Sequence, residues 1–120
     1  MQTFGAMTIQ SASPDELGAH VSAAGGVEKA PARAAALGAA SLQLFTKQPS
    51  RWVEPKISAE TAAAFKAERE IHGVRVAGAH DSYLINLSTP DPKLWRMSQR
   101  CFQGELERCC SLGLDFMVTH

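Results

Sequence analysis

Three of the four histidines occupy the same position in a repeating pattern of short apolar runs and longer helical stretches. His20, His80 and His120 each lie at the carboxyl end of a predicted strand, and the first two close the same tripeptide, GAH. Such strand ends form the ligand-binding rim of parallel α/β folds, and neutral imidazole is a good zinc ligand. A single histidine is more often a structural residue, so the shared position of three predicts a metal site. His72, at a helix end, is expected to be a surface or capping residue.

The loop after the second predicted strand, TKQPSRWVEPK, interleaves cations with an aromatic side chain. Lys47, Arg51 and Lys56 flank Trp52, and this pattern can hold phosphate groups and stack on a base or sugar. The alternative is a solvated loop with Trp52 folded inward, which composition alone slightly favours. Lys47 and Arg51 are therefore candidate DNA contacts on residue type, with both interpretations open.

The loop after the third predicted strand, DSYLINLSTPD, places bulky apolar side chains at the expected rim. Tyr83, Leu84, Ile85 and Leu87 could be wedges that enter a base stack. They could equally form a lid packed on the top of the fold. The residue types alone do not choose between these two interpretations.

The elements that would position these residues alternate regularly along the chain. Apolar runs predict strands at residues 17–21, 41–45, 74–79 and 115–119, and periodicity predicts helices at 26–37, 59–72 and 92–112. Alternating strands and helices favour parallel strands joined by crossover helices. The pattern therefore predicts an α/β fold.

Local signals mark the ends of the predicted helices. Ser58 and Asp91 are good amino-terminal caps, and Pro31 predicts that the first helix kinks or begins late. Glycine adopts the left-handed conformation that ends a helix at little cost, and each helix is followed by one: Gly38, Gly73 and Gly113. One face of the last helix is expected to pack on the sheet: Trp95, Ser98, Phe102, Leu106 and Cys109.

Size and composition set outer limits. The 120 residues suffice for one domain but fall short of the roughly 250 of a closed (β/α)8 barrel. Lysine plus arginine number 12 and aspartate plus glutamate 12, so no overall basic field attracts DNA. The three cysteines lack CxxC spacing and are expected to be packed, reduced thiols. Without a signal sequence or a membrane span, the expectation is a cytoplasmic protein with a loose tail at residues 1–16.

Three motifs together resemble a known family. They are GAHVSAAGG at residues 18–26, LFTKQPSRW at 44–52 and HDSYLINL at 80–87. In this order and at these separations they are similar to the amino-terminal part of endonuclease IV, the zinc-dependent apurinic/apyrimidinic endonuclease family. The resemblance implies a (β/α)8 TIM barrel of the xylose-isomerase-like type. Residues 17–120 would form its first three βα units and its fourth strand.

The family resemblance also implies an activity and a site. Such enzymes act in base excision repair and hydrolyse the phosphodiester bond 5′ to an abasic site in double-stranded DNA, using a cluster of three zinc ions. His80 and His120 would bind one zinc, and Tyr83 and Leu84 would insert into the damaged duplex. His20 lies in a family motif beside the site and would support it without binding metal.

The resemblance is less exact in the loop after the second strand. The family commonly has an arginine one place before Arg51, where this chain has Ser50. Arg51 either takes over that minor-groove contact from a shifted position or the contact is absent. Lys47 in the same motif remains a candidate DNA contact.

The remaining zinc ligands of the family belong to later strands. We therefore expect this chain to be an incomplete part of an enzyme that is monomeric at full length, inactive by itself and independent of membranes. Two alternatives stay open. One is a metal-dependent sugar isomerase or epimerase of the same barrel type, and the other is a half-barrel module that binds a partner without catalysis.

Overall fold

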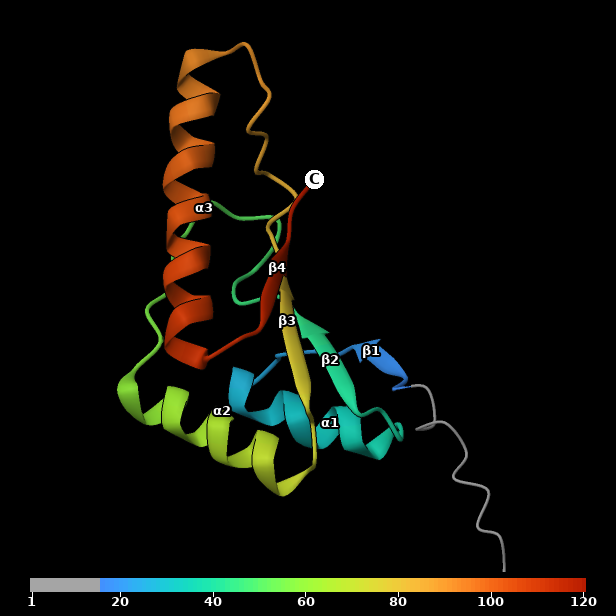
Figure 1. The fold of residues 1–120 in the computed structure, drawn as a ribbon. Coiled ribbons are helices and arrows are strands. Elements are labelled where there is room, and N and C mark those ends of the chain that lie inside the picture. The colour runs from blue at the N-terminus through green and yellow to red at the C-terminus, as the bar shows by residue number, and fades with distance from the viewer. Residues whose placement is uncertain (1–15) are drawn as a thin grey trace, which may run out of the picture.

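The computed structural model describes residues 16–120, and the predicted tail at residues 1–16 lies outside them except for Glu16. Four strands form a single parallel sheet in the order β1-β2-β3-β4 (Figure 1). Their bounds are Gly18–His20, Ser41–Leu44, Val76–His80 and Phe116–Val118. Between them lie the 3-10 helix η1 at Val27–Lys29 and the helices α1 at Ala30–Ala36, α2 at Ala59–Ile71 and α3 at Pro92–Leu112.

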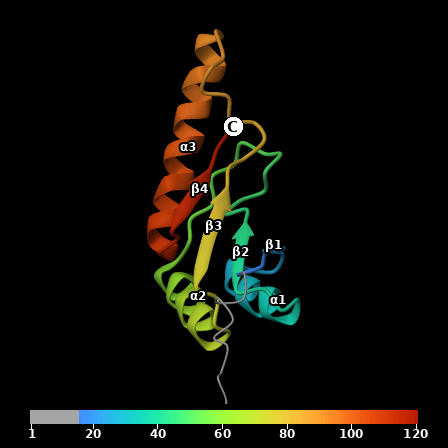
Figure 2. The ribbon, with the colours of Figure 1, turned by 45° about the vertical axis from the view of Figure 1, so that its right-hand side comes forward.

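This alternation confirms the predicted βα order, with small differences in the bounds. Each strand is shorter than predicted at one or both ends, and β3 begins two residues late, at Val76. The reason is that Val74 belongs to the turn after α2, where its N–H donates to the carbonyl of Arg69. Strands β2, β3 and β4 run in one direction, so the segments that follow them meet at one end of the sheet (Figure 2).

The predicted helix ends are also found. The Ser58 side chain accepts a hydrogen bond from the Thr61 N–H, and Asp91 accepts two from Lys93 and Leu94. The first helix begins late, because η1 precedes it and Pro31 stands in its first turn, where a missing N–H costs little. The glycines after the helices have φ values of 74°, 65° and 65° at Gly38, Gly73 and Gly113.

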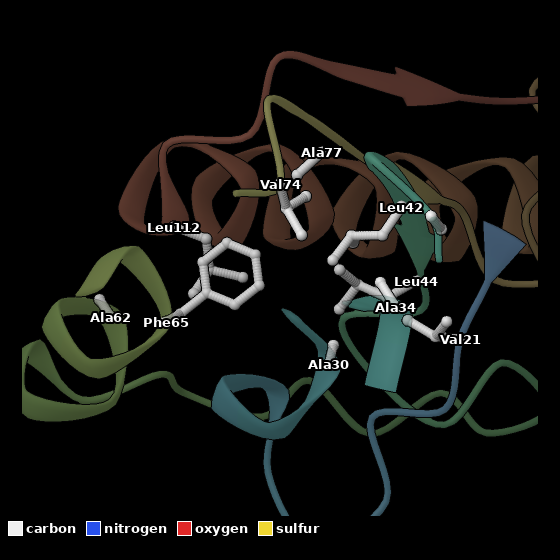
Figure 3. Packing of buried hydrophobic residues seen from close by; sticks show 11 residues of the cluster. Val21, Ala30, Ala34, Leu42, Leu44, Ala62, Phe65, Val74, Ala77 and Leu112 are labelled. Atoms are coloured by element: carbon white, nitrogen blue, oxygen red, sulfur yellow. The ribbon is translucent and has the colours of Figure 1, made fainter. Parts of the chain in front are cut away.

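The hydrophobic core lies between the sheet and the helices that cover one of its faces. Phe65 of α2 and Leu112 of α3 are fully buried and lie together in this layer (Figure 3). Small alanine side chains let α1 approach β2 closely. The buried cluster consists of Val21, Ala30, Ala34, Ala39, Leu42, Leu44, Ala62, Phe65, Val74, Ala77 and Leu112.

The two GAH tripeptides owe their glycines to the neighbouring strands. A Cβ on Gly18 would collide with the Ser41 side chain of β2, and one on Gly78 with the ring of Phe116 of β4. Glycine at these two positions leaves room for the Ser41 and Phe116 side chains of the neighbouring strands. In both tripeptides, the glycine two residues before the histidine thus accommodates a side chain of the adjacent strand.

The prediction of which face of α3 packs on the sheet is partly wrong. Trp95 and Leu106 are 42% and 43% exposed, whereas Glu105 and Arg108 are buried on the side toward the sheet. The amino-terminal turns of α3 extend beyond the sheet (Figure 1), and Trp95 belongs to the first of these turns. The charged residues are buried because they bind polar groups of the rim loops, as described below.

The remaining predictions concern single residues and membranes. His72 is the carboxyl-terminal cap residue of α2, as predicted, and its Nε2 lies 3.1 Å from Oε2 of Glu68 one turn earlier. Cys101 and Cys109 are buried free thiols, and burial raises the pKa of each to about 11. Cys110 is also free but exposed, so the prediction of a packed thiol is wrong for this residue. Among residues 16–120, no helix combines the length and the apolar character that crossing a membrane requires.

Candidate metal centre and DNA-contact loops

His80 and His120 meet at the carboxyl end of the sheet. His80 is the last residue of β3, and His120 lies two residues beyond β4, whose Val118 pairs with His80. Their Nε2 atoms are 2.8 Å apart, and their ring centroids are separated by 4.8 Å. Parallel pairing of adjacent strands therefore brings together two imidazoles that are 40 residues apart in sequence.

The hydrogen bonding of His80 suits a metal ligand. Its Nδ1 lies 2.8 Å from the backbone carbonyl oxygen of Asp81, and a carbonyl can only accept, so Nδ1 carries the proton. The lone pair is then on Nε2, which faces His120. A second nitrogen bonded to a backbone carbonyl is the usual arrangement of zinc-bound histidine. Two nitrogens on one tetrahedral zinc stand roughly 3.3 Å apart, about 0.5 Å more than in this pair, so a small separation of the two rings would let them share an ion.

The described residues provide no third ligand to this pair. Within residues 16–120, no group of three histidine, cysteine, aspartate or glutamate side chains is placed to hold a metal ion. Asp81 is adjacent but buried, and its Oδ2 accepts a hydrogen bond of 2.5 Å from the Thr119 hydroxyl. Its carboxylate therefore holds the end of β4 beside β3.

An aromatic group connects the first histidine to the pair. The ring of Phe45 lies 4.6 Å from that of His20, 5.6 Å from that of His80 and 5.3 Å from that of Tyr83, measured between centroids. His20 also has its Nδ1 3.1 Å from Oε1 of Gln43. His20 thus lies beside the site, with its ring next to that of Phe45. Sequence reasoning missed Phe45, although it follows β2 at the same rim.

The loop after β3 separates its apolar side chains into two groups. Ile85 is buried, whereas Tyr83 is 68% exposed and Leu84 is half-buried beside it. The backbone beneath them is held, because the Tyr83 N–H donates to the Pro49 carbonyl and the Leu84 N–H to the Ser82 hydroxyl. Ile85 therefore packs as a lid residue would, while Tyr83 projects from an ordered backbone.

Lys47 does not occupy the position that a DNA contact needs. It is only 7% exposed, and its ammonium donates to Glu54 at 2.5 Å and to the Cys101 sulfur at 3.1 Å. Its charge is neutralised inside the protein, where no phosphate can reach it. Arg51 and Lys56, in the same loop, are exposed, and Trp52 is half-buried. Of the two candidate cations, Arg51 is the exposed one and Lys47 the buried one.

A buried polar network below the rim was not visible in the sequence. Glu54 binds both Lys47 and Arg108, the latter at 2.6 Å. Burial raises the pKa of Glu54, but hydrogen bonds from Cys101, Lys47 and Arg108 outweigh it and hold the pKa below its usual range. Burial also raises the pKa of Glu105, which lies beside Arg108 on α3. The one signal for this network in the sequence was the presence of Glu105 and Arg108 among the positions of α3 that face inward.

Comparison with known proteins places this geometry in a family. Residues 31–120 match the model of the xylose isomerase-like TIM barrel family. A protein of Thermoplasma acidophilum called probable endonuclease 4 is 41% identical over 104 residues, which cover 87% of this chain and 37% of the relative. A protein of Chloroflexus aggregans with the same name is 45% identical over 103 residues, covering 86% of this chain and 36% of the relative.

A solved structure agrees with the sequence relatives. The crystal structure of endonuclease IV from Thermus thermophilus superimposes with a TM-score of 0.79 at 37% identity, over 83% of this chain and 38% of that one. The described strands therefore correspond to less than half of a complete relative. The fold and the resemblance predicted from the three motifs are confirmed, and the chain belongs to the xylose isomerase-like TIM barrel family.

Proposed function

We propose that this chain supplies the first four strands of a zinc-dependent abasic-site endonuclease of base excision repair. The observation that carries the proposal is the meeting of the His80 and His120 Nε2 atoms at 2.8 Å, with the His80 proton held on Nδ1. This is a ready pair of nitrogen ligands at the rim where barrel enzymes act. The similarity to endonuclease 4 proteins supports the same assignment.

The chemistry follows from the ligand pair and its surroundings. A bound zinc ion would lower the pKa of water from about 15.7 to roughly 7 and so provide hydroxide for attack on the phosphodiester. His80 and His120 would orient the ion, and Asp81 would hold their two strands together. Further ligands must come from outside the described residues, so we propose that residues 16–120 alone do not cleave DNA.

Damage selection would come from the loops beside the metal. A nucleotide without a base leaves the stack at low cost, and its gap can be filled by an inserted side chain. Tyr83, exposed on a held backbone, is placed to fill it, with Leu84 beside it. Arg51 is the exposed cation of the neighbouring loop. The substrate would be double-stranded DNA with an abasic site, and the setting a cytoplasmic repair reaction.

Binding tests the recognition half of this proposal. The zinc-loaded 120-residue chain should bind a duplex with a central abasic site at least about tenfold more tightly than the same duplex with all bases present, which corresponds to about 1.4 kcal/mol. Fluorescence anisotropy at one fixed salt concentration measures both. Equal affinities for the two duplexes would contradict the proposal.

A chimaera tests the catalytic half. Residues 16–120 would replace the corresponding segment of the Thermus thermophilus enzyme, which supplies the rest of the barrel. The chimaera should cut abasic DNA on the 5′ side and leave a 3′ hydroxyl that a polymerase extends, and His120→Ala should abolish cutting. His72→Ala is the matched control and should keep it. Cutting that survives loss of His120, or a folded but inactive chimaera, would oppose the assignment.

A further inference from the structure

Glu105 is a buried acid that neither the proposed metal site nor the proposed DNA contacts use. It lies on α3, is fully buried, and its carboxylate sits beneath two of the rim loops. A buried carboxylate is costly unless it is hydrogen-bonded and lies near a positive charge. Its partners therefore indicate what it does.

The two carboxylate oxygens of Glu105 bind two different loops. Oε1 accepts a hydrogen bond of 3.0 Å from the backbone N–H of Ser82, which follows β3 and directly precedes Tyr83. Oε2 accepts one of 3.3 Å from the hydroxyl of Thr46, which follows β2. One side chain of an outer helix thus joins the segments that leave two adjacent strands.

A second connection fixes the same point from the other side. The Ser82 hydroxyl donates to the Pro49 carbonyl at 2.6 Å, and the Tyr83 N–H donates to that same carbonyl at 3.0 Å. Ser82 is therefore held between Glu105 and Pro49. The backbone of Tyr83 cannot shift without breaking these bonds.

Arg108 completes the support one turn further along α3. Its Nε donates to the Thr46 hydroxyl at 3.0 Å, and its Nη1 donates to Glu54 at 2.6 Å. Its other terminal nitrogen, Nη2, lies 3.9 Å from Glu105. The positive charge beside the buried carboxylate stabilises its ionised form, which accepts stronger hydrogen bonds than a neutral one.

We infer that Glu105 is a positioning residue that holds the loop bearing Tyr83 and Leu84 in its DNA-inserting conformation before DNA binds. The inference rests on the proposed function, because it assumes that Tyr83 and Leu84 enter the damaged duplex. A loop ordered in advance loses little conformational freedom on insertion, which favours binding. Loss of Glu105 would make that ordering part of the cost of binding.

The test measures preference for abasic over intact duplex in the full 120-residue chain. Glu105→Ala removes both acceptors and should lower this preference at least about fivefold to tenfold. Glu105→Gln keeps a carbonyl oxygen for the Ser82 N–H and should restore most of it. Glu107→Ala, an exposed acid on the same helix, is the matched control and should leave the preference unchanged.

A double-mutant cycle separates positioning from general stability. In a Tyr83→Ala background, Glu105→Ala should cause a clearly smaller further loss of preference, because only Leu84 is left for it to position. Equal losses with and without Tyr83 would overturn the inference, as would a folded Glu105→Ala chain with full preference. If that variant does not fold, Thr46→Val removes one of the two loop contacts and should lower the preference about threefold.

Hydrogen exchange gives an independent readout. The Ser82 and Tyr83 amides should exchange faster in Glu105→Ala than in the unchanged chain, while core amides of β3 such as that of Ala77 keep their protection. Unchanged exchange at Ser82 would overturn the inference. If the unchanged chain showed no abasic preference at all, the proposed function would fail, and exchange alone would still report whether Glu105 orders the loop.

Discussion

The two ends of the parallel sheet differ in how far the chain itself supplies partners for their polar side chains. At the amino end, Arg69 of α2 donates to the carbonyls of Val74, Arg75 and Gly113 and to the Asp115 carboxylate. At the carboxyl end, the Nε2 atoms of His80 and His120 face each other, and the nearby carboxylate of Asp81 lies 3.7 Å from the other ring nitrogen of His80, Nδ1. The amino end is thus satisfied by the chain itself, while the carboxyl end presents ligands for something else.

This difference separates stability from function within one fold. The Arg69 clamp, meaning Arg69 with its three carbonyls and Asp115, joins α2 to the starts of β3 and β4. The Nε2 atoms of the histidine pair have only each other as partners among the described residues, as expected where a barrel binds its ligand. Changes at the amino end should therefore lower the free energy of unfolding and leave metal and DNA binding intact. Changes at the rim should weaken metal or DNA binding and leave the free energy of unfolding nearly unchanged.

The largest effect is expected at the histidine pair. His80→Ala or His120→Ala should weaken zinc binding about 100-fold or more, since either change removes one of two ligands held in place. Competition with a chromophoric chelator measures this affinity. His72→Ala, a histidine at the end of α2, should bind zinc like the unchanged chain. Equal losses in all three variants would show that zinc binds elsewhere.

Breaking the clamp should have the next largest effect, and on stability alone. Arg69→Met removes four hydrogen bonds at the amino end and should lower the free energy of unfolding by about 2 kcal/mol. Urea denaturation measures the loss. Arg75→Met, which removes an exposed ion pair with Glu16, should cost less than about 0.5 kcal/mol. A change in zinc affinity in Arg69→Met would contradict the separation of the two ends.

A smaller effect is expected at the projecting aromatic. Tyr83→Ala should lower affinity for an abasic duplex about tenfold, because stacking of an aromatic side chain is worth roughly 1–3 kcal/mol per base. Affinity for intact duplex should hardly change. Leu37→Ala, an equally exposed apolar residue at the amino end, is the control. The comparison fails if both variants weaken abasic binding alike.

The smallest effect is expected on the stability of the chain at acid pH. The N–H of Ala77 and then the Arg69 guanidinium hold the pKa of Asp115 below its usual range. A lowered folded-state pKa adds stability above the ordinary carboxyl pKa of about 3.9, and that part is lost as pH falls through the folded value. Nearly half of the Asp115 side chain is exposed, so the contribution should stay below about 1 kcal/mol.

Urea midpoints at several pH values check this contribution. The difference in stability between the unchanged chain and Asp115→Asn should be constant from pH 7 to about 5 and shrink below about pH 4. A difference that grows on acidification would have the wrong sign for a lowered pKa.

Most of the fold could be predicted from local sequence patterns. Glycines after helices, the caps Ser58 and Asp91, and the GAH repeat are signals within a few residues, and the structure follows them. The meeting of His80 and His120 also followed, because parallel order alone brings strand ends to one rim.

Long-range pairing of charges was beyond the same reasoning. Lys47 is of a residue type that is usually exposed in loops. Its burial depends on Glu54 and on Cys101, which is 54 residues away. Glu105 and Arg108 are likewise of residue types expected in solvent, until Ser82 and Thr46 are placed beside them. Charged residues can be buried when partners from other elements satisfy them, and no short sequence window contains those partners.

The most direct test of the account is the nitrogen spectrum of the histidine rings during zinc titration. Long-range ¹H–¹⁵N correlation of the ¹⁵N-labelled chain resolves Nδ1 and Nε2 of each imidazole. The Nε2 chemical shifts of His80 and His120 should change together, and the change should be complete at one equivalent of zinc. The proton of His80 should remain on Nδ1. A titration that moves only one of these two rings, or moves His72 instead, would contradict a zinc ion shared by His80 and His120.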